Sequence, residues 1–159
     1  MPTPNYSENT QQRIADMRLG IRVDRPSAVL TAATVPIFYV HGGNVIMTGF
    51  YGEIMGLLDA AAVISLNMDV DTGTDTAIAS NSADGNTYVV GRMLYLPAVA
   101  GAATWTAECG ACPITVAPTY ILRPGHIDMV CNGGHTTGAM RWSMWYVPMD
   151  AAAYVDLTA

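Results

Sequence analysis

Hydrophobic and polar residues alternate with a period of two along Ile127 to Met149, the pattern expected of two half-buried β-strands. In the second strand one face is entirely large and apolar, and it consists of Met140, Trp142, Met144 and Tyr146. The opposite face consists of Arg141, Ser143, Trp145 and Val147. The segment between the strands, Asn132 to Gly138, contains three glycines that permit positive φ angles. We therefore predict a hairpin, with Trp142, Met144 and Tyr146 as anchors of the core or of a subunit interface.

A shorter version of the same pattern runs from Val35 to Tyr51. Its flanks are β-branched and aromatic, and the turn between them is His-Gly-Gly-Asn at residues 41–44. Two adjacent glycines between such flanks indicate a second hairpin. Gly49 and Gly52 interrupt the returning strand and predict a bulge or a bend.

Further short strands follow, separated by turns rich in Gly and Pro. The segments predicted as strands are Ala60 to Met68, Thr87 to Leu96, Ile114 to Val116 and Thr119 to Leu122, the last two split by Pro118. The polar stretch Asp69 to Asn86 is predicted as an exposed loop, with one helical turn near Ala77 to Ser80. Many short strands without a sustained helical pattern predict an all-β fold, a β-sandwich or jelly-roll-like barrel.

Residues 1–34 are predicted as an extended N-terminal arm, and residues 35–159 as the β-sandwich body. The arm has several prolines and only dispersed apolar residues, so alone it buries too little to offset its ordering entropy. A short helix from Gln11 to Gly20 is the competing interpretation. Four of the seven arginines lie in the arm and are predicted to pair with carboxylates of a partner protein: Arg13, Arg18, Arg22 and Arg25.

The composition favours an oligomer. Hydrophobic residues make up 51% of the chain, charged residues only 13%, and lysine is absent. Soluble domains average roughly 25% charged residues, so much of this surface is expected to be covered by other subunits. A closed homo-oligomer is the simplest such cover.

The net charge of −6 does not suit nucleic-acid binding, which needs a basic surface to neutralise phosphates. No apolar run approaches the roughly 18 residues of a membrane span, and the polar N-terminus lacks the pattern of a secretory signal. We expect a soluble protein made in the cytoplasm, with neither nucleic acid nor membrane among its partners.

Cysteine and histidine spacing provides the sharpest chemical motif. Cys109 and Cys112 have the two-residue spacing of a zinc knuckle or redox pair, and Cys131, His126 and His135 are the candidates to complete a zinc site. The latter three do not form the second close ligand pair that such motifs carry. A thioredoxin-like role needs a βαβ context that the pattern lacks. We expect no structural zinc and no redox function.

Other catalytic and metal motifs fail as well. Asp69, Asp71 and Asp75 resemble the start of a calcium loop, but Ser80 stands where the bidentate Glu is required. The chain has no nucleophile elbow, zinc-protease helix or phosphate-binding loop. Glutamate occurs only at positions 8, 53 and 108, which gives little support to a paired-carboxylate hydrolase. We predict a protein without catalytic residues, cofactor or metal.

Three segments carry a resemblance to a known family: RLGIRVDRPSAVL (residues 18–30), HGGNVIMTGFYGE (41–53) and RPGHIDMVCNGGHTTGAMRWSMWYVPMD (123–150). They resemble head decoration, or cement, proteins of tailed bacteriophages. The resemblance implies a β-rich homo-oligomer, expected to be a trimer, on the outer surface of the capsid. It also implies that the major capsid protein is the partner and that an extended terminus clamps neighbouring coat subunits.

Two other classes of function stay open at this stage. The first is a head or tail fibre module that binds host glycans, for which Trp142, Trp145 and Tyr146 would be stacking candidates. Aromatic residues that alternate on a strand are more often core or interface. The second is a small metal-dependent or redox enzyme, for which no nucleophile or complete ligand set is evident.

Overall fold

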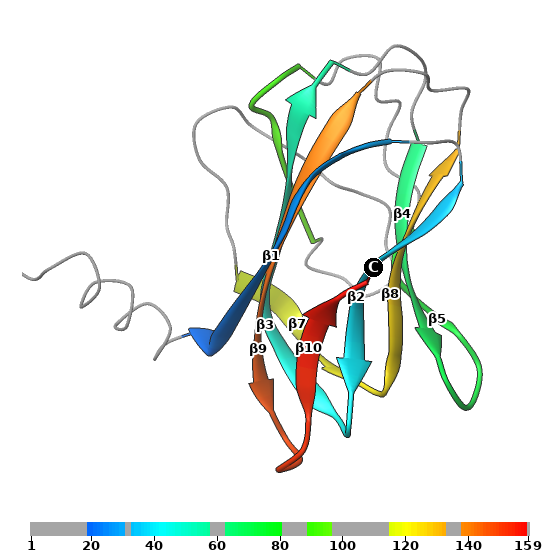
Figure 1. The fold of residues 1–159 in the computed structure, drawn as a ribbon, viewed down its shortest axis with the longest axis vertical. Coiled ribbons are helices and arrows are strands. Elements are labelled where there is room, and N and C mark those ends of the chain that lie inside the picture. The colour runs from blue at the N-terminus through cyan, green and yellow to red at the C-terminus, as the bar shows by residue number, and fades with distance from the viewer. Residues whose placement is uncertain are drawn as a thin grey trace, which may run out of the picture.

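The computed structural model describes residues 19–30, 33–57, 63–80, 89–96, 115–132 and 138–158. In these residues the chain forms two antiparallel sheets, so the all-β prediction is confirmed (Figure 1). The strands are β1 (Ile21–Val29), β2 (Thr34–His41), β3 (Val45–Gly56), β4 (Val63–Val70), β5 (Thr76–Ala79), β6 (Met93–Tyr95), β7 (Thr115–Leu122), β8 (Gly125–Asn132), β9 (Ala139–Pro148) and β10 (Tyr154–Leu157). No helix among the described residues is long and apolar enough to cross a membrane.

The first sheet, called sheet 1 below, has the order β1-β9-β3. The far edge of β3 pairs with β7 near its start and with β6 further along. The second sheet, sheet 2, has the order β10-β2-β8-β4-β5. Figure 1 shows the strands of sheet 1 on one side of the molecule and those of sheet 2 on the other. Most steps along the chain pass from one sheet to the other.

The core lies between the sheets because both present an apolar face to the interior. Phe38 of β2 meets Phe50 of β3 edge to face, with ring centroids 6.3 Å apart. Burial of one large apolar side chain contributes roughly 1.5–3 kcal/mol, so the shared core stabilises the packing of the two sheets. The largest fully buried side chains are Leu30, Ile37, Phe38, Met47, Phe50, Ile54, Ile64, Leu66, Ile78, Leu94 and Ile127.

The predicted anchors of β9 all lie in this core. Trp142, Met144 and Tyr146 are 2%, 0% and 3% exposed. The ring of Trp142 lies against Gly52, its partner on β3, where an added Cβ atom would come within 2.4 Å of the indole. Gly52 is therefore needed for the close approach of a large ring, whereas the predicted bulge occurs between Met47 and Gly49.

Both predicted hairpins are wrong in their pairing, although their strands exist. β8 pairs with β2 and β4 in sheet 2, whereas β9 pairs with β1 and β3 in sheet 1. β2 and β3 are separated between the sheets in the same way. Alternation tells which side chains face the core, but a connection that crosses between sheets gives the same alternation as a hairpin.

The turn between β2 and β3 is nevertheless tight. Gly42 has φ 68°, and an added Cβ there would lie 2.2 Å from the carbonyl oxygen of Ala152. The connection from β9 to β10 packs on this turn, where Asn44 N donates to Asp150 Oδ2 over 2.7 Å. The two glycines of this turn thus let the chain cross from sheet 2 to sheet 1 while the connection between β9 and β10 packs directly against it.

Three other sequence predictions need correction. β5 lies within the predicted loop and replaces its predicted helical turn, because Ile78 and Ala79 are buried. β6 is shorter than the predicted strand, which begins at residues outside the described ranges. Pro118 does not split β7, since the register with β3 shifts there and the strand lies at a sheet edge that tolerates a missing N–H.

The N-terminal arm is not confirmed. Residues 1–18 lie outside the described ranges, and residues 21–29 are the edge strand β1, paired with β9 from Ile21 to Val29. The sandwich therefore begins before residue 35. Composition misled here because an edge strand is solvated on several sides and needs few apolar residues.

Candidate functional site

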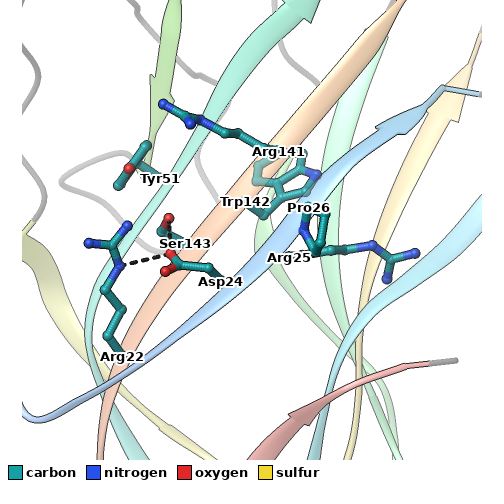
Figure 2. Close-up of a pocket in the computed structure, with 8 residues that line it drawn as sticks. All are labelled: Arg22, Asp24, Arg25, Pro26, Tyr51, Arg141, Trp142 and Ser143. Carbon is teal, nitrogen blue, oxygen red and sulfur yellow. Dashed lines mark hydrogen bonds and ion pairs between the residues drawn. The ribbon is translucent and has the colours of Figure 1, made fainter.

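The outer face of sheet 1 contains a hollow of about 250 Å³, called the sheet 1 cleft (Figure 2). β1, β3 and β9 form its walls. The lining residues are Arg22, Asp24, Arg25, Pro26, Tyr51, Arg141, Trp142 and Ser143. Arginine, carboxylate, hydroxyl and aromatic groups thus meet on one surface.

The cleft lies beside an irregularity in β1. The register between β1 and β9 shifts between Arg25 and Ala28, and Pro26 within this interval has no N–H to donate to the ladder. The regular pairing is interrupted next to Trp142. This interruption leaves space on the sheet surface that a continuous strand would fill.

The centre of the cleft is a row of three residues on neighbouring strands. Asp24 of β1 is the register partner of Ser143 of β9, which in turn is the partner of Tyr51 of β3. Ser143 Oγ donates to Asp24 Oδ1 over 2.5 Å, and Arg22 Nε donates to the same oxygen over 2.8 Å (Figure 2). Asp24 is therefore held by two donors on its Oδ1 atom.

A second ion pair flanks this row. Arg141 of β9 stands opposite Glu53 of β3, and its Nε donates to Glu53 Oε2 over 2.8 Å. Arg141 Nη2 donates to the same oxygen. These bonds raise the pKa of Arg141 above its ordinary value, because the Glu53 carboxylate stabilises the charged guanidinium.

Aromatic rings bound the other flank. The guanidinium of Arg22 lies over the ring of Trp145, 5.1 Å from its centroid, and Tyr51 lies 5.9 Å from the same ring. The alternation of β9 placed Trp145 on the outer face, yet it is only 6% exposed and its Nε1 has no hydrogen-bond partner. Trp145 is thus covered although it lies on the outer face of sheet 1, and Tyr51 is the ring beside it that lines the cleft.

The side chain of Arg25 points in a different direction from that of Arg22. Figure 2 shows its side chain directed away from Asp24 and Tyr51. Its Nη1 donates to the carbonyl oxygen of Pro36 on β2 and, over 2.8 Å, to Thr158 Oγ1. Burial lowers the pKa of Arg25. Arg25 therefore bridges the two sheets along the edge that β1 and β10 share.

The four arginines predicted to bind a partner thus separate into three groups. Arg13 and Arg18 lie outside the described residues. Arg22 lines the cleft, with a side chain that is 35% exposed, whereas Arg25 holds the fold together. Of the four, Arg22 is the described residue that retains solvent-facing charge.

The residues considered for metal binding do not converge. No group of three or more His, Cys, Asp or Glu in the described part of the chain is arranged to hold a metal ion. Asp71 accepts from the Tyr39 hydroxyl over 2.7 Å, and Asp75 accepts weakly from the amide of Val70. Cys131 is a buried free thiol, and burial raises its pKa. Cys109, Cys112 and His135 lie outside the described residues.

Sequence patterning placed only two of the eight lining residues on the face that forms the cleft. It placed Arg141 and Ser143 on the outer face of β9, but it did not associate them with Asp24, Tyr51 or Glu53. Those neighbours come from strands more than 80 residues away in the chain. Only the register between strands brings them together, and no local signal reports that register.

The cleft presents hydrogen-bonding groups that are fixed by contacts with one another. Its serine hydroxyl donates to a carboxylate that also accepts from an arginine. Comparisons of this chain with protein-family models, with curated proteins and with solved structures found no match.

Proposed function

We propose that the protein is a non-enzymatic virion structural protein that decorates and stabilises a bacteriophage capsid. It binds the major capsid protein on the outer capsid surface as a homo-oligomer, with a trimer as the expected form. The observation that carries this proposal is the order of the strands. The resemblance of three sequence segments to phage decoration proteins supports it independently.

The strand order supports a jelly roll as the finer architecture. Without β6 and β10, sheet 1 has the order β1-β9-β3-β7 and sheet 2 has the order β2-β8-β4-β5. Numbered along the chain, these eight strands follow 1-8-3-6 in one sheet and 2-7-4-5 in the other. This is the arrangement of two joined Greek keys in a double-sheet jelly roll, an architecture of viral capsid proteins and of lectins. Fold alone does not establish function, so the assignment needs a direct test.

An apolar row on the outer face of sheet 1 supports association with another protein surface. Ile46 of β3 stands between Ile121 of β7 and Val147 of β9 as the register partner of both. Ile121 is 60% exposed and Val147 40% exposed. Adjacent exposed apolar side chains on a surface with few charges favour a protein interface.

The test uses purified full-length protein and capsids that lack a decoration layer. We expect a trimeric mass in native mass spectrometry and saturable cosedimentation with the capsids. Ile121→Asp should weaken one of these two associations by at least about tenfold, because it places an unpaired charge in an apolar contact. Thr72→Asp, on an exposed turn, is the matched control and should leave both unchanged. A monomer that fails to sediment with any such capsid would overturn the proposal.

A further inference from the structure

We propose that the sheet 1 cleft binds a neutral glycan through one sugar residue. The proposal goes beyond capsid decoration and does not depend on it. It rests on the donors and acceptors that remain unused in the cleft, on the balance of the charges that face a ligand and on the ring of Tyr51.

The two exposed arginines keep donors for a ligand. Arg22 uses Nε for Asp24, and Arg141 uses Nε and Nη2 for Glu53. Within the described residues, Arg22 Nη1 and Nη2 and Arg141 Nη1 have no further protein acceptor. Both guanidinium groups are held in place, Arg22 over the ring of Trp145 and Arg141 by its two bonds to Glu53.

The two carboxylates keep acceptors in the same way. Both bonds to Asp24 end on Oδ1, and both bonds to Glu53 end on Oε2. Asp24 Oδ2 and Glu53 Oε1 are therefore left to accept from a ligand. Tyr51 stands in the central row of the cleft, and its hydroxyl can both donate and accept.

This combination discriminates between classes of ligand. The charges of Arg22 and Arg141 are matched by those of Asp24 and of Glu53, which lies beside the lining residues. The third lining arginine, Arg25, points away from this row and is bonded to Pro36 and Thr158, so the groups that face a ligand are close to charge balance. A bare anion would face the free carboxylate oxygens, and a cation would face the guanidinium groups. A sugar hydroxyl donates and accepts at once, so a sugar with several hydroxyls satisfies both kinds of group.

The aromatic side chains provide the second element of recognition. The ring exposed to the cleft is that of Tyr51, and Trp145, which is 6% exposed beneath Arg22, supports it from the side with the two rings inclined by 31°. A sugar ring presents C–H groups on its faces, which pack on aromatic surface while the hydroxyls at its rim form hydrogen bonds. Because these groups stand on paired strands, binding immobilises few new side chains.

The size of the cleft limits what it holds. Its volume of about 250 Å³ lies below the roughly 300–1,000 Å³ of pockets for drug-sized ligands. One sugar ring therefore fits, and the rest of a glycan extends into solvent. We expect a dissociation constant on the order of 1 mM for a single sugar, and tighter apparent binding when an oligomer engages several chain ends.

The experiment titrates the intact protein with methyl glycosides of glucose, galactose, mannose and N-acetylglucosamine. Tryptophan fluorescence and ligand-observed NMR report binding. We expect at least one neutral glycoside to bind saturably, whereas sodium sulfate and N-acetylneuraminic acid do not compete. Tyr51→Phe and Glu53→Gln should each weaken binding by about tenfold. The first removes a hydroxyl contact to the sugar, and the second removes the carboxylate charge that accepts from the sugar and holds Arg141 in place.

Tyr154→Phe is the matched control, because Tyr154 is an exposed tyrosine on the outer face of sheet 2. It should leave glycoside binding unchanged, and thermal melts should show all variants folded. Failure of the whole panel to bind, preferential binding of the anions, or binding that survives both cleft variants would overturn the proposal. Capsid cosedimentation of the same variants keeps this outcome separate from the decoration proposal, since Tyr51→Phe and Glu53→Gln are expected to sediment normally.

Discussion

The charged side chains are arranged differently on the outer faces of the two sheets. On sheet 1 each carboxylate has an arginine, as in Arg22 with Asp24 and Arg141 with Glu53. On sheet 2 the charged side chains are mostly acidic, and they surround Asp128, which is 8% exposed and has an Oδ1 without a hydrogen-bond partner. On the outer face of sheet 1 positive and negative side chains are paired, whereas the outer face of sheet 2 carries mainly negative charge.

The aromatic residues differ between the faces in the same sense. On sheet 2 the rings of Tyr39, His41, His126 and Tyr154 form a continuous row, with neighbouring centroids 4.0–4.7 Å apart. These rings contact one another. On sheet 1 the rings of Tyr51 and Trp145 stand beside charged pairs, and Tyr51 borders the cleft. Both sheets have register shifts, so the paired charge of sheet 1 is the feature that distinguishes the two outer faces.

The largest effect is expected where the cleft meets the core. Trp142 lines the cleft and also packs against Gly52 and Phe50. Trp142→Ala should destabilise the protein by about 3–5 kcal/mol, because it removes a fully buried aromatic ring. Chemical denaturation measures the change. A midpoint equal to that of the parent would mean that the ring is not part of the core, and the contrast between the two faces of sheet 1 would be lost.

The second prediction compares two arginines on the same edge strand. Arg25→Ala should cost about 1–3 kcal/mol of folding free energy, because it removes a part-buried charged donor to the Pro36 carbonyl and Thr158 and leaves that carbonyl only the Thr158 hydroxyl as a side-chain donor. Arg22→Ala should cost less, since its partner Asp24 is half exposed. Thermal melts of both variants test the difference. If the two melt alike, Arg25 does not bridge the sheets.

The same edge strand changes the expectation for truncation. Deletion of residues 2–25 would remove half of β1 together with Arg25, so it should lower the melting temperature markedly. Deletion of residues 2–18 stops before β1 and should leave the sandwich stable. A shortened protein that lacks 2–25 and melts like the parent would restore the interpretation of this segment as a separate arm.

The third prediction concerns the acidic face of sheet 2. Burial, together with repulsion from Asp69 and Asp75, raises the pKa of Asp128 despite a favourable contribution from His126. A carboxyl group whose pKa is higher in the folded state stabilises the fold when protonated, and that stabilisation is lost as pH rises through the folded-state pKa. Asp128→Asn should therefore stabilise the protein at neutral pH, and its advantage should shrink as pH falls toward the ordinary pKa of aspartate.

Melts of parent and variant at several pH values measure this change. An advantage of Asp128→Asn that is independent of pH would show that the substitution acts through packing and not through charge.

The sequence predicted the parts of this fold that depend on local alternation. The inward face of β9, with Trp142 and Met144, follows directly from a period of two, and so does the existence of β2, β3 and β8. The partners of these strands were not predictable, because strand pairing joins residues far apart in the chain and a crossing between sheets leaves the same pattern as a hairpin. β5 was missed because a strand of four residues is too short to show a period.

The cleft could not be predicted from the sequence for the same reason. Arg141 and Ser143 were placed on the outer face, but a site needs neighbours, and these come from β1 and β3 through register. The mistaken arm removed β1 from the sheet altogether, so that Asp24 had no expected place near Ser143. A bulge next to Pro26 opens the cleft, and it depends on how β1 meets β9 rather than on the identity of Pro26 alone.

The smallest effect on folding free energy is expected from the Arg141–Glu53 ion pair on the outer face of sheet 1. Arg141 and Glu53 have side chains that are 47% and 19% exposed, so water and salt screen their attraction. A double-mutant cycle with Arg141→Met and Glu53→Gln should give a coupling free energy of at most about 1 kcal/mol, falling further as salt is added. The pair then contributes little to folding, and its value lies in fixing the positions of Nη1 and Oε1 at the cleft. Each single variant should accordingly reduce glycoside binding far more than it reduces the melting temperature. A coupling well above 1 kcal/mol that salt does not change would instead make the pair a structural element of sheet 1, comparable with Arg25 at the opposite edge.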